Sequence, residues 1–334
     1  MIKVNFTDFW PGFDENNLFL KFLKKHFSIA ISNNPDYLFY SVHGNSHLKY
    51  KDCIKIFYTG ENLVPDFNLC DYALGFQYID FGDRYLRFPL HVYYQWFYTD
   101  YFNCRPDSIN IIRNKGDELH KRKFCNFIYS NNVSSDPMRD LFFYELNKYK
   151  KVDSGGKHLN NIGKPVADKM GFIKDYKFTI AFENSSVPGY VTEKLIEPII
   201  MSSLPVYYGN PLVHMEFNVD SFIQVKDKND FDRAIKEIIF LDQNDDNYLE
   251  KLNQPKFKYE NALQDWEEKL LAFMKNIFNQ PVTTAYRRTH YGFNRFHIED
   301  LKQQAHLLEE RKRKNYIKTK IKGLFYKMLT LLGK

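Results

Sequence analysis

The sequence of 334 residues has no run of about eighteen consecutive apolar residues, the length that a membrane-spanning helix needs. Its first residues, MIKVNF, include neither a long apolar region nor a small-residue cleavage site, so a signal peptide is not predicted. They predict instead a first β-strand over Ile2 to Phe6. These absences together predict a cytoplasmic protein.

Cysteine is scarce, and no clear Asp-x-Asp metal signature is found. None of the cysteines stands in a CxxC pair, so the sequence predicts neither a zinc site nor a disulfide framework. We expect free thiols at all of them: Cys53, Cys70, Cys104 and Cys125.

Most of the chain has no excess of positive charge, although the net charge is +6. The segment from Leu301 to Lys334 holds ten Lys and Arg against two acidic residues, so residues 1–300 carry a net charge of −2. The basic character therefore belongs to the C-terminal segment. Because no nucleic-acid-binding pattern accompanies it, we predict no nucleic-acid partner.

The most informative stretch runs from Phe178 to Pro211. It reads as an apolar strand over Phe178 to Phe182, a polar loop, a helix that begins near Thr192, and a second apolar run from Leu204 to Tyr208. In a parallel sheet this β-loop-α-β unit places the loop and the helix N-terminus at the carboxyl edge of the strands. That edge is where α/β folds bind ligands.

The first turn of this helix has an unusual charge. Thr192 suits an N-cap, which leaves backbone N–H groups available to phosphate oxygens. Lys194 is unfavourable there because a cation opposes the helix dipole, and a bound anion would remove the conflict. The alternative for Glu193 and Lys194 is a solvated first turn.

Several blocks in this order resemble glycosyltransferase family 10, the α1,3-fucosyltransferases, especially the bacterial members. The resemblance covers roughly Ile54 to Pro211. It is carried by the following runs and residues: Phe57-Tyr58-Thr59-Gly60-Glu61-Asn62, Asp83-Arg84-Tyr85-Leu86-Arg87-Phe88-Pro89-Leu90, Ser130-Asn131, Arg139, Phe182-Glu183-Asn184-Ser185 and Gly189-Tyr190-Val191-Thr192-Glu193-Lys194.

The resemblance implies an α/β protein of the GT-B class, with two Rossmann-like domains facing each other across a cleft. We place an acceptor-binding domain at residues 1–120 and a domain that binds GDP-fucose at residues 121–280. Residues 281–334 are predicted to form a crossing segment and a basic amphipathic tail.

The resemblance also implies roles for individual residues. Glu61 matches the carboxylate assigned as general base, and the end of a predicted strand, Ile54 to Tyr58, would hold it in place. Arg139 matches an arginine that contacts the donor diphosphate, for which a guanidinium fork is well suited. The other expected donor-binding residues are Ser130, Asn131, Asn184, Tyr190, Glu193 and Lys194.

The loop after the first strand provides a tentative acceptor site. Trp10, Asp14 and Glu15 combine an aromatic face for sugar C–H groups with carboxylates for hydroxyls. The alternative for Trp10 is burial under its own loop.

The expected reaction is inverting transfer of L-fucose from GDP-β-L-fucose to a lactose-type or N-acetyllactosamine-type oligosaccharide, giving the α1,3 linkage of Lewis-type glycans such as lipopolysaccharide O-antigen. We expect no obligatory metal, although Mg²⁺ or Mn²⁺ could stimulate departure of the diphosphate. Two alternatives stay open: a GT-B transferase for another nucleotide sugar, and a non-catalytic nucleotide-binding protein docked on a membrane.

The C-terminal segment has the pattern of an interfacial helix. Apolar residues from Ile317 to Leu332 recur at helical spacing, and lysines occupy much of the remaining surface. We therefore predict an anionic membrane surface as a partner, with the protein peripheral on the inner face of the cytoplasmic membrane. The alternative is a helix that packs on the body.

Overall fold

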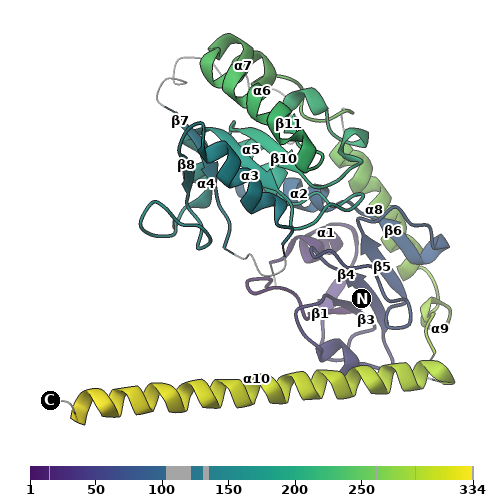
Figure 1. Cartoon of the computed structure of the whole chain (residues 1–334). Coiled ribbons are helices and arrows are strands. Elements are labelled where there is room, and N and C mark those ends of the chain that lie inside the picture. The colour runs from purple at the N-terminus through teal and green to yellow at the C-terminus, as the bar shows by residue number, and fades with distance from the viewer. Residues whose placement is uncertain (15, 103–121, 131–134, 260–261, 290, 333–334) are drawn as a thin grey trace. The chain divides into compact units, whose positions relative to one another are not determined.

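The computed structural model describes residues 1–14, 16–102, 122–130, 135–259, 262–289 and 291–332 (Figure 1). Contacts divide the chain into two units: unit 1 comprises Met1–Thr59, Pro65–Ala73 and Ile277–Lys334, and unit 2 comprises Gly60–Val64 and Leu74–Asn276. The predicted domain boundaries at 120 and 280 stay predictions, and the first falls among residues 103–121, outside the described part.

Unit 1 contains most of a six-stranded sheet with the order β2-β1-β3-β4-β5-β6. Strand β1 pairs in parallel with β2 and β3, and β3 pairs in parallel with β4. The division between the units passes through β5, so β6 belongs to unit 2. The strands are β1 (Ile2–Thr7), β2 (Ile29–Ile31), β3 (Tyr37–Tyr40), β4 (Ile54–Tyr58), β5 (Tyr72–Gly75) and β6 (Tyr85–Arg87).

Helix α1 (Leu18–His26) has the bounds that its apolar spacing predicts. It begins at Asn17, whose side-chain oxygen accepts the N–H of Leu20 at 2.9 Å. Its apolar face is buried through residues such as Phe19 and Phe22, while its last turn carries the favourable cations Lys24 and Lys25.

A buried carboxylate holds the returning C-terminal segment in unit 1. Asp71, which is fully buried just before β5, accepts hydrogen bonds from the N–H groups of Arg287 and Arg288 at 2.7 and 3.0 Å and from Arg288 Nε at 2.9 Å. The N–H of Lys55 in β4 donates to the same carboxylate at 2.7 Å. Asp71 thus joins two strands to the segment after α9 (Val282–Ala285).

Unit 2 contains a five-stranded sheet with the order β11-β10-β9-β7-β8, and all of its pairs are parallel. Its strands are β7 (Lys123–Phe127), β8 (Val152–Ser154), β9 (Tyr176–Phe182), β10 (Leu204–Tyr208) and β11 (Ile223–Gln224). Its helices are α2 (Leu90–Phe102), α3 (Met138–Asn147), α4 (Lys169–Lys174), α5 (Glu193–Ile200), α6 (Phe231–Gln243), α7 (Asp245–Leu252) and most of α8 (Ala262–Phe278).

The predicted β-loop-α-β unit is present as β9, α5 and β10. Strands β9 and β10 are in register from Phe178 opposite Leu204 to Phe182 opposite Tyr208. Every residue of both strands is buried, as expected for parallel strands covered on both faces. Helix α5 buries Leu195, Ile196 and Ile199 on this sheet, so the loop before α5 lies at the carboxyl edge.

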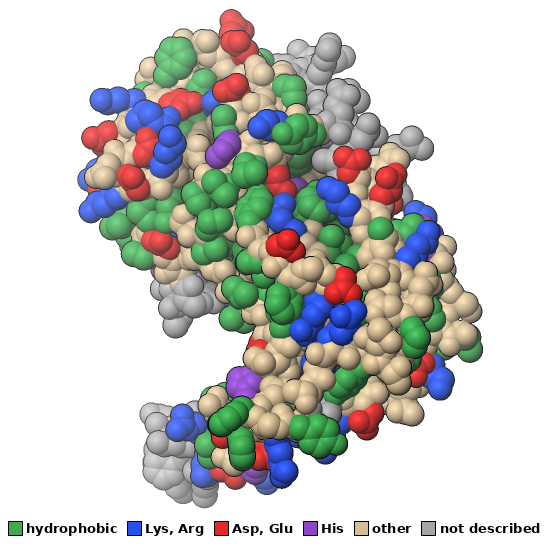
Figure 2. Space-filling view, turned by 90° about the vertical axis from the view of Figure 1, so that its right-hand side faces the viewer, with side chains coloured by type: hydrophobic (Ala, Val, Ile, Leu, Met, Phe, Trp, Pro, Cys, Tyr) green, Lys and Arg blue, Asp and Glu red, His purple; other side chains and the backbone are tan. Residues whose placement is uncertain are grey.

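Charge is mixed on the surface of the protein. In the view of Figure 2, Lys and Arg side chains are interspersed with Asp and Glu. The cysteines Cys53, Cys70 and Cys125 are buried free thiols, as predicted, while Cys104 lies outside the described residues.

The C-terminal segment forms a helix of 40 residues, α10 (Phe293–Leu332) (Figure 1). His297 Nε2 lies 3.0 Å from Asp66 Oδ2, which connects its first turns to unit 1. In the described part of the chain, no helix is long and apolar enough to cross a membrane. From Asn315 onward the structure describes the helix but not its side chains. The predicted amphipathic pattern, which depends on those side chains, stays a prediction.

Candidate active site

The centre of the site is a buried carboxylate at the carboxyl end of β9. Glu183 is 0 % exposed, and its two oxygens accept the N–H and the hydroxyl of Thr192, each at 2.7 Å. The Thr192 oxygen in turn accepts the N–H of Lys194 at 3.4 Å, so Thr192 is the predicted N-cap of α5. These hydrogen bonds therefore link the C-terminal end of β9 to the N-terminus of α5.

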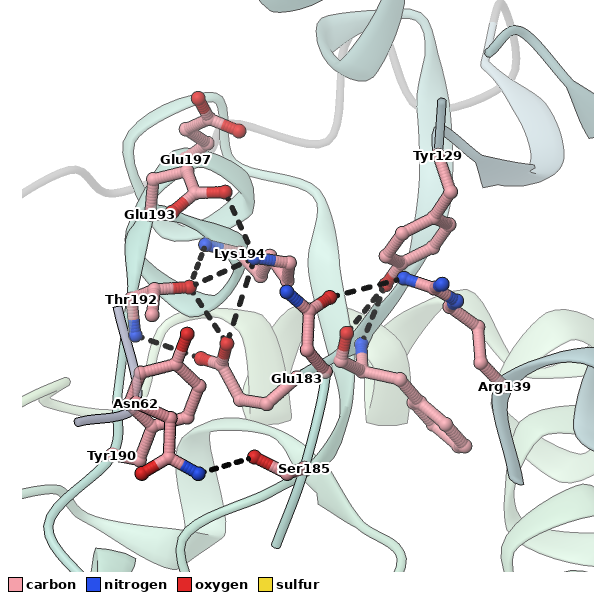
Figure 3. Close-up of polar contacts among 12 residues, drawn as sticks. Asn62, Tyr129, Arg139, Glu183, Ser185, Tyr190, Thr192, Glu193, Lys194 and Glu197 are labelled. Carbon is pink, nitrogen blue, oxygen red and sulfur yellow. Dashed lines mark hydrogen bonds and ion pairs between the residues drawn. The ribbon is translucent and has the colours of Figure 1, made fainter. Parts of the chain in front are cut away.

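Lys194 turns back over this cap (Figure 3). Its ammonium lies 3.0 Å from Glu193 Oε1, 3.2 Å from Thr192 Oγ1 and 3.7 Å from Glu183 Oε2. The carboxylates of Glu193 and Glu183 thus provide negative charge beside Lys194. This charge offsets the unfavourable position of a cation at the N-terminus of a helix. The Lys194 side chain keeps 15 % exposure.

The charges of this cluster are strongly coupled. Burial would lower the pKa of Lys194, but Glu193 and Glu183 raise it above its usual value. Burial would raise the pKa of Glu193, yet Lys194 and Lys169 lower it to about 2. For Glu183 the compensation is incomplete: burial raises its pKa to about 7, although Lys194 and Thr192 oppose the shift.

A second cation lies on the other side of Glu183 in Figure 3. Arg139, in the first turn of α3, is 1 % exposed, and its guanidinium carbon lies 4.1 Å from the centre of the Tyr129 ring. Its Nη1 donates to Asn184 Oδ1 at 3.4 Å. The ring is itself fixed, because the Tyr129 hydroxyl accepts the N–H of Phe182 at 2.7 Å and lies 2.9 Å from the carbonyl oxygen of Ile180.

Arg139 and Lys194 both lie near the Tyr129 side chain. Burial raises the pKa of the Tyr129 hydroxyl, and both cations oppose that shift through their charge. Arg139 lies on the Tyr129 ring, and Tyr129 and Lys194 line one small cavity, so both cations are near this residue. The structure therefore brings together the two cations that the sequence placed on separate helix N-termini.

Glu61 lies in the segment Gly60–Val64, which belongs to unit 2 by its contacts, and its side chain is exposed. The charge of Glu61 also affects the pKa of Tyr190. Burial raises the pKa of Tyr190; Glu183, Glu61 and Glu193 raise it further, and Lys194 opposes them. Tyr190 itself is 2 % exposed, with its ring 5.1 Å from that of Phe76.

The remaining expected site residues are distributed over both units. Ser130 is exposed after β7, while Asn131 and Glu15 lie outside the described residues. In unit 1, Asp14 lines a cavity of about 410 Å³. Trp10 is half-buried in an aromatic cluster, edge-on to Phe9 and Phe13 with ring centres 5.6 and 5.0 Å away. Its partial burial follows from this packing.

The sequence assigned no role to Tyr129 or Glu183, although Glu183 stands in a quoted block. A carboxylate directly after a largely apolar strand is a signal that could have identified Glu183, because a buried charge needs partners. Tyr129 has no comparable signal, since its contact with Arg139 depends on how β7 and α3 pack.

Arg87, in another of the quoted blocks, has a structural partner in unit 2. Its guanidinium forms two hydrogen bonds with the Glu216 carboxylate, at 2.8 and 3.1 Å, and lies 3.9 Å from the centre of the Tyr78 ring. His91 Nε2 lies 3.3 Å from the same carboxylate. The ion pair joins the segment around β6 to residues 213–217.

Metal ligands are not grouped in the described part of the chain. Among those residues, no three His, Cys, Asp or Glu side chains are placed to hold one ion.

Two family models match the chain in succession. "Alpha-(1,3)-fucosyltransferase FucT N-terminal domain" matches residues 4–94, and "Glycosyltransferase family 10 (fucosyltransferase) C-term" matches residues 118–283. A crystal structure of α1,3-fucosyltransferase with GDP is 30 % identical, has a TM-score of 0.68, and is matched over 84 % of this chain and 90 % of that chain. The chain belongs to glycosyltransferase family 10.

Other members of the family support this assignment. The Helicobacter pylori alpha-(1,3)-fucosyltransferase FucT is 32 % identical over 329 residues, covering 83 % of this chain and 66 % of the relative. Drosophila melanogaster alpha-(1,3)-fucosyltransferase B is 34 % identical over 33 % of this chain, and the match covers 27 % of the relative. The matches thus span less than two thirds of these relatives' lengths.

A second crystal structure, of α1,3-fucosyltransferase with GDP-fucose, has a TM-score of 0.67 and 30 % identity, with 84 % of this chain and 90 % of that chain covered. Together with the two parallel sheets, this likeness confirms the predicted α/β GT-B fold class.

Proposed function

We propose that the protein transfers L-fucose from GDP-β-L-fucose to a hydroxyl of an N-acetylglucosamine or glucose unit in a lactose-type or N-acetyllactosamine-type acceptor, forming an α1,3 linkage. Family membership supports the reaction class, and solved structures similar to this chain hold GDP or GDP-fucose. The observation that carries the proposal is that, in unit 2, Arg139 lies on the Tyr129 ring while Tyr129 and Lys194 line one small cavity.

The donor diphosphate would bind to these two cations. A guanidinium lying on an aromatic ring presents its N–H groups in a fixed plane, which suits two phosphate oxygens at once. Lys194 adds a point charge, and its side chain is 15 % exposed. Ser130, Asn131, Asn184 and Tyr190 complete the proposed donor site, with Glu193 at the sugar or ribose hydroxyls.

In the proposed reaction Glu61 is the base. Its carboxylate takes the proton of an acceptor hydroxyl, and that oxygen forms a bond to the anomeric carbon of fucose from the face opposite the nucleotide. The bond from this carbon to the phosphate oxygen breaks, and its electron pair leaves with GDP. Arg139 and Lys194 stabilise the charge that develops there, and the configuration inverts from β to α.

The acceptor is assigned to unit 1. The cavity beside Asp14 supports this, because its lining joins polar and aromatic side chains, as a sugar site requires. With its volume of about 410 Å³ it could hold one or two sugar rings. Its lining residues are Asn5, Phe6, Thr7, Asp8, Phe9, Phe13, Asp14, Asn17, Leu20 and Ile31.

The proposal is tested by incubating the protein with GDP-fucose and a panel of lactose and N-acetyllactosamine acceptors, with the products identified by mass spectrometry and linkage analysis. Glu61→Gln should lower turnover at least about 100-fold with little change in GDP affinity, because only the base is lost. Loss of GDP affinity in this variant would remove Glu61 from the role of base. Turnover of another nucleotide sugar in preference to GDP-fucose would favour the alternative transferase.

We also propose that no metal is obligatory and that Mg²⁺ or Mn²⁺ stimulates only by assisting diphosphate departure. EDTA treatment should then leave a basal rate.

For the tail we propose association with anionic lipid on the inner face of the cytoplasmic membrane. The described part of α10 supports this with exposed apolar side chains beyond Asp300, namely Leu307 and Leu308. A chain ending near Asp300 should bind anionic vesicles more weakly than the full chain, and equal binding would contradict the proposal.

A further inference from the structure

The segment that carries Glu61 is a short part of unit 2 between two segments of unit 1. Thr59 and Pro65, on either side of it, belong to unit 1, whereas Gly60–Val64 belongs to unit 2 by its contacts. Its residues from Glu61 to Val64 are exposed, and it forms no helix or strand. A base on such a segment needs support from neighbouring side chains to keep its position.

Two side-chain hydrogen bonds provide that support. Asn62 Nδ2 donates to Ser185 Oγ at 2.8 Å (Figure 3). Gln77 Nε2 donates to the carbonyl oxygen of Leu63, also at 2.8 Å. Gln77 is itself fixed, because its carbonyl oxygen accepts the Tyr85 hydroxyl at 2.9 Å.

The partner of Asn62, Ser185, lies in the loop between β9 and α5. Ser185 is two residues after Glu183, at the start of the loop that leads to α5. Farther along this loop Gly189 has φ = +85°, and a Cβ there would lie 2.5 Å from the carbonyl oxygen of Phe76. The N–H of Gly189 also donates to Asn210 Oδ1 at 2.8 Å.

Both neighbours of Ser185 are also held by hydrogen bonds. The carbonyl oxygen of Asn184 accepts the N–H of Asp136 at 2.8 Å. On the other side, Ser186 Oγ donates to the carbonyl oxygen of Gly209 at 2.8 Å.

We propose that Asn62 and Ser185 are positioning residues that set the base relative to the donor. Their hydrogen bond fixes the position of Glu61 relative to the loop between β9 and α5. The carboxylate therefore stays in the same position with different acceptors. The inference rests on the proposed function, because it takes Glu61 as the base. It assigns to this contact between two side chains a role separate from donor binding.

The test is a double-mutant cycle with Asn62→Ala, Ser185→Ala and both together. Each single change should lower kcat about 10- to 100-fold, since small displacements of a catalytic group have effects of this size. The GDP dissociation constant should stay within about twofold. The double variant should be no slower than the slower single variant, because both changes remove one contact. Ser185→Thr, which keeps the hydroxyl, should restore most of the rate.

Matched controls are Asn68→Ala and Ser32→Ala, whose side-chain hydrogen bonds are to residues two positions away. They should leave kcat unchanged. Losses in the double variant that multiply, or weaker GDP binding with normal kcat, would overturn the inference.

A readout independent of activity separates this inference from the proposed function. Amide hydrogen exchange across residues 60–64 should accelerate in Ser185→Ala, and unchanged exchange would overturn the positioning role even in an active enzyme. Accelerated exchange in a protein that transfers no fucose would instead contradict the proposed function.

Discussion

The ammonium of Lys194 and the carboxylate of Glu183 face one another at the start of α5, with Nζ 3.7 Å from Oε2. The carboxylate is fully buried and also accepts two hydrogen bonds from Thr192. Even so, burial raises the pKa of Glu183 to about 7. The carboxyl group of Glu183, at the C-terminal end of β9, is therefore expected to change its protonation in a pH range in which ordinary carboxylates stay ionised.

The first prediction concerns stability. Between about pH 4.5 and about pH 7 folded Glu183 holds a proton that the unfolded chain has released, so its contribution to the free energy of unfolding falls as pH rises. Glu183→Gln should remove this decline, which amounts to about 3 kcal/mol at most. Urea unfolding at pH 4.5 and pH 7.5 measures it.

The matched control for that experiment is Glu145→Gln. Glu145 is an exposed carboxylate whose partner is Lys148 at 2.7 Å. The control should keep the pH dependence of the original protein, and an unchanged dependence in Glu183→Gln would show that Glu183 titrates normally.

The second prediction concerns Lys194. Lys194→Ala should weaken GDP binding about 10- to 100-fold, because a charge-assisted contact to phosphate contributes roughly 1.5–3 kcal/mol. Isothermal titration calorimetry with GDP checks this. Lys148→Ala, an exposed lysine paired with Glu145, is the control. Affinity equal to that of the unmodified protein would count against a diphosphate contact.

The third prediction distinguishes charge from shape at Arg139. Arg139→Lys keeps the positive charge but loses the planar fork and the contact with the Tyr129 ring. We expect GDP affinity to fall at least about tenfold while the fold is retained. Arg233→Lys, at an exposed arginine, serves as the control. If lysine supports full affinity, only the charge matters at this position.

The fourth prediction concerns the buried Lys55 in unit 1, which is 4 % exposed. Burial, with the nearby charge of Arg288, lowers its pKa to about 8, whereas the unfolded value is 10.5. The unfolded chain thus binds the proton more tightly, and stability rises as pH increases from about 8 to about 10.5. Removing this buried charge should therefore stabilise the protein at pH 7.

Lys55→Met is the variant to measure, because it keeps the length of the side chain and the N–H that donates to Asp71. The gain at pH 7 should be at most about 3 kcal/mol and should shrink at pH 10. Lys49→Met, at an exposed position, should have no such effect. A lower unfolding temperature in Lys55→Met would show that the ammonium has a stabilising partner.

Local patterns predicted the regular elements well. The bounds of β4 and β10 agree with the predicted strands, because each element buries a face that its own sequence defines, and β9 begins two residues before the predicted Phe178. The short strand β8 was not predicted: Val152–Gly163 reads as a flexible connection, and three residues are too few to show a period.

The sequence by itself determined the family, the parallel β-loop-α-β unit and the N-cap Thr192, since these depend on residues close together in the chain. Only the tertiary structure decided that Arg139 lies on the Tyr129 ring, that Glu183 is a buried partner of Lys194, and that Asn62 contacts Ser185. These contacts join residues from different strands and loops. Their geometry follows from how those elements pack, which no local pattern encodes.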